Sequence, residues 1–250
     1  PSPTFTPTPT PTPSPTLTPT PTPLPLLNGI IGYWKFDEAS AWVNDCTTLT
    51  VIDSSSNNNN GKSCIAGSGP TAAVTGRLGF ARNFSGTGSY VKIASANTLN
   101  FTTGQDFSYT LWFQRSGSTT SSFLFAKGAG GSSDVGYAFV LTNGATPTAI
   151  LSKTGETSRL IMKGTAITDN NWHQITVTYQ RSGLGILYQD GVQTASIDVS
   201  SYNTDLSNTK ALAIGCNSGG STCFAGLLDD VRLYNRVLSA QEAAQLAQGL

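Results

Sequence analysis

The sequence is poor in charged residues, and this shortage limits the partners it can have. Only 11% of its 250 residues are charged, and 14 Lys and Arg balance 14 Asp and Glu. Binding to a phosphate backbone requires clustered Lys and Arg, and no stretch of the chain gathers them. The composition therefore excludes nucleic acid as a partner. No run of about 18 apolar residues occurs, so the sequence predicts no membrane span.

Side chains that carry catalysis are scarce as well. The only histidine is His173, and the only glutamates are Glu38, Glu156 and Glu242. Glycosidases need two carboxylates held at a fixed separation, and nothing in the sequence pairs these glutamates. No motif selects a serine and an aspartate to work with His173, and no nucleophile elbow or phosphate-binding glycine loop occurs. We therefore expect no catalytic residues and a structural role for His173, with a hydrolase as the disfavoured alternative.

Four cysteines form two pairs that are close in sequence, Cys46 with Cys64 and Cys216 with Cys223. This arrangement predicts two disulfides that each close one loop. A zinc site made of four thiolates is the alternative, although no C-x-x-C spacing supports it. Disulfides predict an oxidising compartment, so we expect a secreted or cell-surface protein. Because the chain starts at Pro1 and not at Met, we expect a processed or partial product without its signal peptide.

Proline is confined almost entirely to the N-terminal segment. Residues 1–27 hold 11 of the 13 prolines and repeat with a period of twelve residues. Proline is excluded from helix interiors and central strands, so we expect an extended stalk of polyproline II type with three residues per turn. Since twelve is a multiple of three, Phe5 and Leu17 lie on the same face of this stalk and are its candidate anchors.

Threonine alternates with proline along the stalk, so the hydroxyl groups point to all its sides. Ser and Thr mixed with Pro are typical of O-glycosylated stalks. We expect covalent glycans on Thr4, Thr6, Thr8, Thr10, Thr12, Ser14, Thr16, Thr18, Thr20 and Thr22. The alternative is a flexible linker between the domains of a modular secreted enzyme.

From Asn28 onward the pattern changes to short runs rich in Val, Ile, Tyr, Phe and Trp, separated by Gly, Asn and Ser. Many short strands with frequent turns predict an all-β sandwich or jelly roll over residues 28–250. The expected strands are 30–37, 80–84, 90–94, 107–114, 123–127, 137–141, 149–153, 159–163, 173–179, 185–189, 211–215 and 226–234. Asp190-Gly191 predicts a type I′ hairpin turn. Ser239 and Glu242 form a capping box that predicts a short C-terminal helix through Gln248.

Several segments together resemble the laminin-G-like family of concanavalin A-like jelly rolls. The strongest is residues 226–242, GLLDDVRLYNRVLSAQE, which is similar to the closing strand and following helix of that family. Residues 32–38, GYWKFDE, resemble the opening strand, and 53–61, DSSSNNNNG, resemble a loop that follows it. Further similar segments are 83–91, 107–113 and 172–191. The resemblance implies a concanavalin A-like sandwich and does not select a function, because members of the family bind glycans, bind proteins or support neighbouring domains.

The resemblance also implies a structural calcium ion. Related glucanases hold calcium where the first and last strands meet, through an aspartate that Asp229 matches. Calcium prefers six to eight oxygen ligands, mostly carboxylates and carbonyls. The candidate ligands are Asp37, Asp53, Asn60, the carbonyl of Gly61, and Asp229. The alternative is that these acids cap turns or pair with Lys35 and Arg232.

Two functions remain open from the sequence. The first is a non-catalytic extracellular structural or adhesive module, which self-assembles into a glycosylated surface fibre or filament. The second is a calcium-stabilised carbohydrate-binding module of a larger secreted protein, with candidate sugar-stacking aromatics at Tyr33, Trp42, Tyr137 and Tyr202. Core packing is the alternative for each of these aromatics. The resemblance places Trp34, Trp112 and Trp172 in the core.

Overall fold

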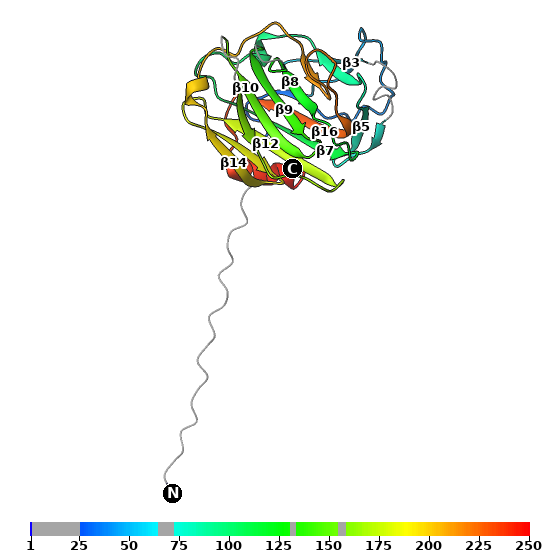
Figure 1. Ribbon diagram of the computed structural model, residues 1–250. Coiled ribbons are helices and arrows are strands. Elements are labelled where there is room, and N and C mark those ends of the chain that lie inside the picture. Colours follow the sequence, from blue (N-terminus) through cyan, green and yellow to red (C-terminus); the bar gives the residue numbers. More distant parts are fainter. Residues whose placement is uncertain (2–25, 65–72, 131–133, 155–158) are drawn as a thin grey trace.

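The computed structural model describes residues 1, 26–64, 73–130, 134–154 and 159–250. The predicted stalk glycosylation sites and the anchors Phe5 and Leu17 lie outside these residues, as does Glu156. Within the described part, the chain folds into two eight-stranded antiparallel sheets that lie one over the other (Figure 1). The expected all-β jelly-roll sandwich is therefore confirmed. None of the described helices is long and apolar enough to cross a membrane.

The first sheet contains both the first and the last strand of the domain. Its order is β14 (Val192–Asp198), β13 (Leu184–Gln189), β12 (Trp172–Tyr179), β7 (Phe107–Arg115), β16 (Ala225–Tyr234), β5 (Phe80–Ser85) and β4 (Ala73–Thr75). Strand β1 (Ile30–Trp34) also pairs with β16, from Ile30 opposite Tyr234 to Trp34 opposite Val231. The opening and closing strands are thus neighbours, as the family resemblance implies.

The second sheet completes the sandwich. Its order is β11 (Leu160–Lys163), β10 (Thr146–Ser152), β9 (Gly136–Thr142), β8 (Ser122–Lys127), β15 (Leu212–Ile214), β6 (Tyr90–Ile93), β3 (Gly61–Cys64) and β2 (Leu49–Val51). Two 3₁₀ turns, η1 (Asn97–Leu99) and η2 (Ser200–Tyr202), lie in the connections.

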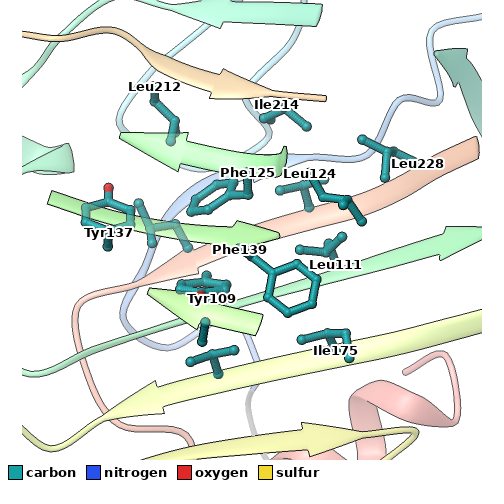
Figure 2. Close-up of a cluster of buried hydrophobic side chains, with 14 of the residues drawn as sticks. Tyr109, Leu111, Leu124, Phe125, Tyr137, Phe139, Ile175, Leu212, Ile214 and Leu228 are labelled. Atoms are coloured by element: carbon teal, nitrogen blue, oxygen red, sulfur yellow. The ribbon is translucent and has the colours of Figure 1, made fainter. Parts of the chain in front are cut away.

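Apolar side chains from both sheets fill the space between the layers. Figure 2 shows Tyr109 and Leu111 from β7 meeting Leu124, Phe125 and Phe139 from the opposite sheet. Each of these five residues is fully shielded from solvent. The alternation of side chains along a strand explains why every second residue of β7 and β12 contributes to this core. At roughly 25 cal/mol per Å² of apolar surface, such burial is the main term that stabilises the fold.

Local signals in the sequence produce the hairpin and the helix. Asp190 and Gly191 both have positive φ, at 50° and 80°, as a type I′ turn requires. Helix α1 (Ala240–Ala247) begins at Ser239, whose hydroxyl accepts from the amide of Glu242 at 3.2 Å, and the Glu242 carboxylate accepts from the Ser239 amide at 2.8 Å. The helix lies beside β12 and β14 (Figure 1).

All the expected strands are present, but the first one is shorter than expected. Strand β1 ends at Trp34, because Phe36 has φ of 65° and leaves the extended conformation. Strands β2, β3, β4 and β14 were not expected from the sequence. The first three span only three or four residues, and β14 is an exposed edge strand without an alternating apolar pattern.

Candidate functional site

The two aspartates on the opening and closing segments hold one turn in place. Asp37 Oδ1 accepts from the amide of Phe80 at 2.8 Å, and Asp229 Oδ2 accepts from the amide of Leu78 at 2.8 Å. Asp229 is fully buried, and its Oδ1 has no hydrogen-bond partner in the described structure. Burial, together with the nearby charges of Asp230 and Asp37, raises the pKa of Asp229 to about 7. A cation near Asp229 would lower the free-energy cost of burying the ionised carboxylate.

The other predicted calcium ligands lie in a loop that uses their oxygens internally. Asp53 accepts four hydrogen bonds, from the amides of Tyr33, Ser55 and Asn59 and from the Ser55 hydroxyl, each at 2.8 Å. Asn60 Oδ1 accepts from the amide of Asp53 at 2.8 Å. This network fixes the shape of the asparagine-rich loop.

The five predicted ligands therefore do not form one cluster. Among the described residues, no three His, Cys, Asp or Glu side chains gather as they would around a metal ion. Asp37 and Asp229 lie on either side of the turn at 76–80, whereas Asp53 and Asn60 organise their own loop and Gly61 begins the buried strand β3. The side-chain oxygens of Asp53 and Asn60 accept hydrogen bonds from backbone amides. This is the turn-capping alternative expected from the sequence.

The candidate sugar-stacking aromatics are mostly buried. Tyr33, Trp42 and Tyr137 are 9%, 3% and 0% exposed, so core packing describes them. Tyr202 is half-buried, and the Lys153 ammonium lies 4.9 Å from the centre of its ring. Trp172, expected in the core, is also only half-buried. Strand alternation alone did not reveal which face of each strand the rest of the chain covers.

The two described glutamates are used structurally. Glu38 Oε1 accepts from the amide of Ile52 at 2.8 Å, and its Oε2 accepts from the Trp42 indole at 3.1 Å. Glu242 caps helix α1 and also forms an ion pair with Arg236.

His173 lies between two aspartates near the protein surface. Its Nδ1 is 2.8 Å from Asp190 Oδ2, and its Nε2 is 2.8 Å from Asp169 Oδ1. Partial burial alone would lower the pKa of His173, but the two carboxylates outweigh it and raise the pKa above the usual value. Asp190 begins the turn between β13 and β14, so its contact with His173 ties this turn to β12.

Two hollows flank the asparagine-rich loop. We call the one with a volume of about 290 Å³ the amide hollow; its lining residues are Ile31, Asn57, Asn97, Thr98, Asn100, Phe101, Gln105, Asp106 and Asn235. The second hollow has a volume of about 390 Å³ and is lined by Leu49, Asn58, Asn59, Asn60, Lys62, Ile93, Ala94, Ser95 and Ala96. The asparagine run at 57–60 was singled out from the sequence as a metal loop. No sequence signal connected it with Asn97 or Asn235.

A disulfide encloses the asparagine-rich loop. Cys46 and Cys64 are bonded with their Cα atoms 4.4 Å apart, and the loop lies between them. The second bond joins Cys216 and Cys223, whose Cα atoms are 4.0 Å apart. The pairing is the one expected from the sequence, so the cysteines form disulfides and not a four-thiolate zinc site.

The fold has known relatives. A family model described as the concanavalin A-like lectin/glucanases superfamily matches residues 85–244. A comparison with curated proteins found no match.

Three solved structures show the same architecture. The binding domain of Paraclostridial Mosquitocidal Protein 1 has 16% identity and a TM-score of 0.68, over 90% of this chain and 53% of that one. The botulinum neurotoxin serotype D ligand binding domain, solved with N-acetylneuraminic acid, has 14% identity and a TM-score of 0.64, over 89% and 51%. Domain 4 of AbnA, an extracellular arabinanase from Geobacillus stearothermophilus solved with arabinotriose, has 20% identity and a TM-score of 0.63, over 88% and 98%. The chain thus spans about half of the toxin domains and nearly all of the arabinanase domain, and at these identities the likeness concerns the fold.

Proposed function

Because this chain belongs to the concanavalin A-like lectin/glucanases superfamily, we propose that its sandwich is a non-catalytic carbohydrate-binding module of an extracellular protein. The observation that carries the proposal is the amide hollow, since side-chain amides both donate to and accept from sugar hydroxyls. Structural neighbours solved with arabinotriose and N-acetylneuraminic acid support the same class of ligand. Nearly the whole length of domain 4 of the extracellular arabinanase is matched, which supports a self-contained module of this size.

We propose a non-catalytic module because its acidic side chains are occupied by structural contacts. Glu38 and Glu242 are both engaged in backbone capping and ion pairs. Asp229 is buried against a turn, and Asp53 has four donors. These engagements support the non-catalytic assignment, since a general acid must be free to reach the substrate oxygen.

The extracellular location is supported by the two disulfides, which persist in oxidising compartments. The Pro/Thr repeat of residues 1–27 fits either a glycosylated stalk or a spacer to a further domain. A surface fibre is the second candidate function, and the repeat is the feature that favours it. Electron micrographs of native material would show regular fibres if this candidate is right and only dispersed monomers if it is not.

Calcium belongs to the proposal only at Asp37 and Asp229. The unpartnered, buried Oδ1 of Asp229 and the neighbouring Asp37 carboxylate fit a cation with oxygen ligands. An ion bound there would tie the turn at 76–80 to the opening and closing strands. Its role would be structural, because binding to the folded state alone adds stability.

The proposed function is tested with the full chain on a glycan array, followed by calorimetric titration of each glycan that binds. We expect a Kd in the millimolar range or tighter for a defined glycan, and no release of sugar from the corresponding polymer. Failure to bind any glycan would contradict the binding function. Turnover of a polymer that is abolished by changing one acidic residue would contradict the non-catalytic assignment.

A further inference from the structure

Building on the proposed function, we infer that the amide hollow is the ligand site and that it takes the end of a neutral saccharide. The hollow combines free amide groups with a lining that, among the described residues, contains no cationic side chain. Asn57, Asn97 and Asn235 are the residues that would recognise the sugar hydroxyls.

Three separate parts of the chain bring these amides together. Asn57 belongs to the asparagine-rich loop, Asn97 begins the 3₁₀ turn η1, and Asn235 follows the last residue of β16. The parts are fixed to one another, because Asn59 Nδ2 donates to the carbonyl of Ile31 at 2.9 Å and to the Thr98 hydroxyl at 3.3 Å. The backbone amide of Asn235 donates to the carbonyl of Gly29, just before β1, at 2.9 Å. A site assembled from such anchored elements is preorganised, which reduces the entropy lost on binding.

The three amides have unused hydrogen-bonding capacity. In the described part of the chain, the side chains of Asn57, Asn97 and Asn235 make no hydrogen bond with protein, and none of the three residues is buried. Each amide offers two donors and one acceptor, so the group can satisfy adjacent hydroxyls of one sugar ring. The other amides of the hollow are occupied in part: Asn100 Oδ1 accepts from the amide of Asn208, and Gln105 Oε1 accepts from Thr102.

The charge of the lining selects a neutral ligand. Among the described residues that line the amide hollow, Asp106 is the only ionisable one, and no Lys, Arg or His is present. Its Oδ1 accepts from the amide of Arg181 at 2.7 Å, which holds the carboxylate in place at the site. Like charges repel at short range, so this lining disfavours sialic and uronic acids and accepts neutral sugars.

The apolar part of the lining is small, because Ile31 and Phe101 are only 8% and 2% exposed. Ile31 and Phe101 are both buried residues that contribute to the wall. The ring of Phe101 is stacked on that of Phe107 with centroids 4.1 Å apart, so its orientation is fixed. A volume of about 290 Å³ lies at the lower end of the ~300–1,000 Å³ found for small-molecule sites, which fits one or two sugar units at a chain end.

The second hollow provides the matched comparison. Its lining contains the cation Lys62 and the exposed apolar side chain of Leu49. Two of its three asparagines have structural partners, since Asn59 binds the Ile31 carbonyl and Asn60 holds the Asp53 amide. The second hollow adjoins the same loop. Substitutions at Leu49 and Lys62 therefore test whether any change of the surface near the loop weakens sugar binding as loss of the amides does.

The experiment measures binding of uncharged trisaccharides by calorimetry. The probes are arabinotriose, xylotriose, cellotriose and mannotriose, with sialyllactose as the anionic probe. The full chain is compared with Asn97→Ala/Asn235→Ala, with Asn57→Ala, and with the control Leu49→Ala/Lys62→Ala. Thermal unfolding of each variant establishes that it folds, which is expected because the asparagine amides that are removed make no hydrogen bonds within the described structure.

We expect at least one neutral trisaccharide to bind the unchanged chain, and sialyllactose not to bind. One lost hydrogen bond weakens binding by about two- to tenfold, so the Asn97→Ala/Asn235→Ala variant should lose about tenfold and the control should lose nothing. Equal binding by this variant and the unchanged chain would overturn the site while leaving the proposed function standing. Binding of sialyllactose alone would overturn the neutral ligand class. No binding of any of these probes by the unchanged chain would overturn this inference, whereas the proposed function would be overturned only if the glycan array also showed no binding.

Discussion

Removing the disulfide that closes the asparagine-rich loop should both destabilise the fold and loosen the amide hollow. Cys46 and Cys64 are 18 residues apart, and the bond encloses β2, the loop and β3. A cross-link reduces the conformational entropy of the unfolded chain, and the reduction grows with the logarithm of the loop length. Loss of this bond in Cys46→Ala/Cys64→Ala should therefore lower the free energy of unfolding by about 3 kcal/mol. The Cys216–Cys223 bond spans only 7 residues, so its loss should remove about 2 kcal/mol.

The measurement is urea unfolding followed by tryptophan fluorescence at 25 °C, with hydrogen exchange of the backbone amides as the local readout. The Cys46→Ala/Cys64→Ala variant should show faster exchange across 49–64 than the Cys216→Ala/Cys223→Ala variant, which serves as its control. Binding of a neutral trisaccharide should weaken only in the first variant, since the Cys46–Cys64 bond encloses Asn57 of the amide hollow, whereas residues 216–223 line neither of the two hollows.

Two results would refute the reasoning. A loss below about 1 kcal/mol for the Cys46–Cys64 pair would show that the unfolded chain gains little freedom when this bond is removed. Faster exchange of equal size in both variants would show that the bond has no special effect on the asparagine-rich loop.

Three further predictions concern stability. Calcium should raise the melting midpoint of the full chain relative to EDTA, and the Asp229→Asn variant should lose this shift. In EDTA the variant should be at least as stable as the unchanged chain, because the amide carries no buried charge. Equal midpoints of the unchanged chain with calcium and with EDTA would contradict the site. The pKa of His173 is raised in the folded state, so its stabilising effect is complete below about pH 6.5 and is lost as the pH rises through the folded pKa; denaturant titrations across this range should show the slope, and His173→Gln should remove it. Ser239→Ala should cost about 1 kcal/mol through loss of the helix cap, measured by thermal unfolding against Ala240→Ser as a surface control.

Features that depend on neighbouring residues could be predicted from the sequence. Asp190-Gly191 forms its turn because positive φ at both positions is a local property. The cap at Ser239 needs only the residue three positions later, and each disulfide joins cysteines that are near in sequence. The twelve expected strands are all present for the same reason, because alternation of apolar residues is visible within a few positions, although the first strand ends earlier than expected, at Trp34.

The candidate site could not be predicted in this way. The sequence grouped Asp53 with Asp37 and Asp229 by resemblance, but the structure gives Asp53 to its own loop and buries Asp229 beside a turn. The sequence also gave no reason to connect Asn97 with Asn235, which are far apart along the chain.

The sequence by itself determined the fold class, the local turns, the helix cap and the cysteine pairing. Tertiary structure alone decided which asparagines share a hollow, which aromatics are covered and which carboxylate is left buried without a full set of partners. The physical reason is that strand pairing in a sandwich is long-range: β1 meets β16 across about two hundred residues, so the surroundings of a side chain depend on register and layer packing that no local pattern contains.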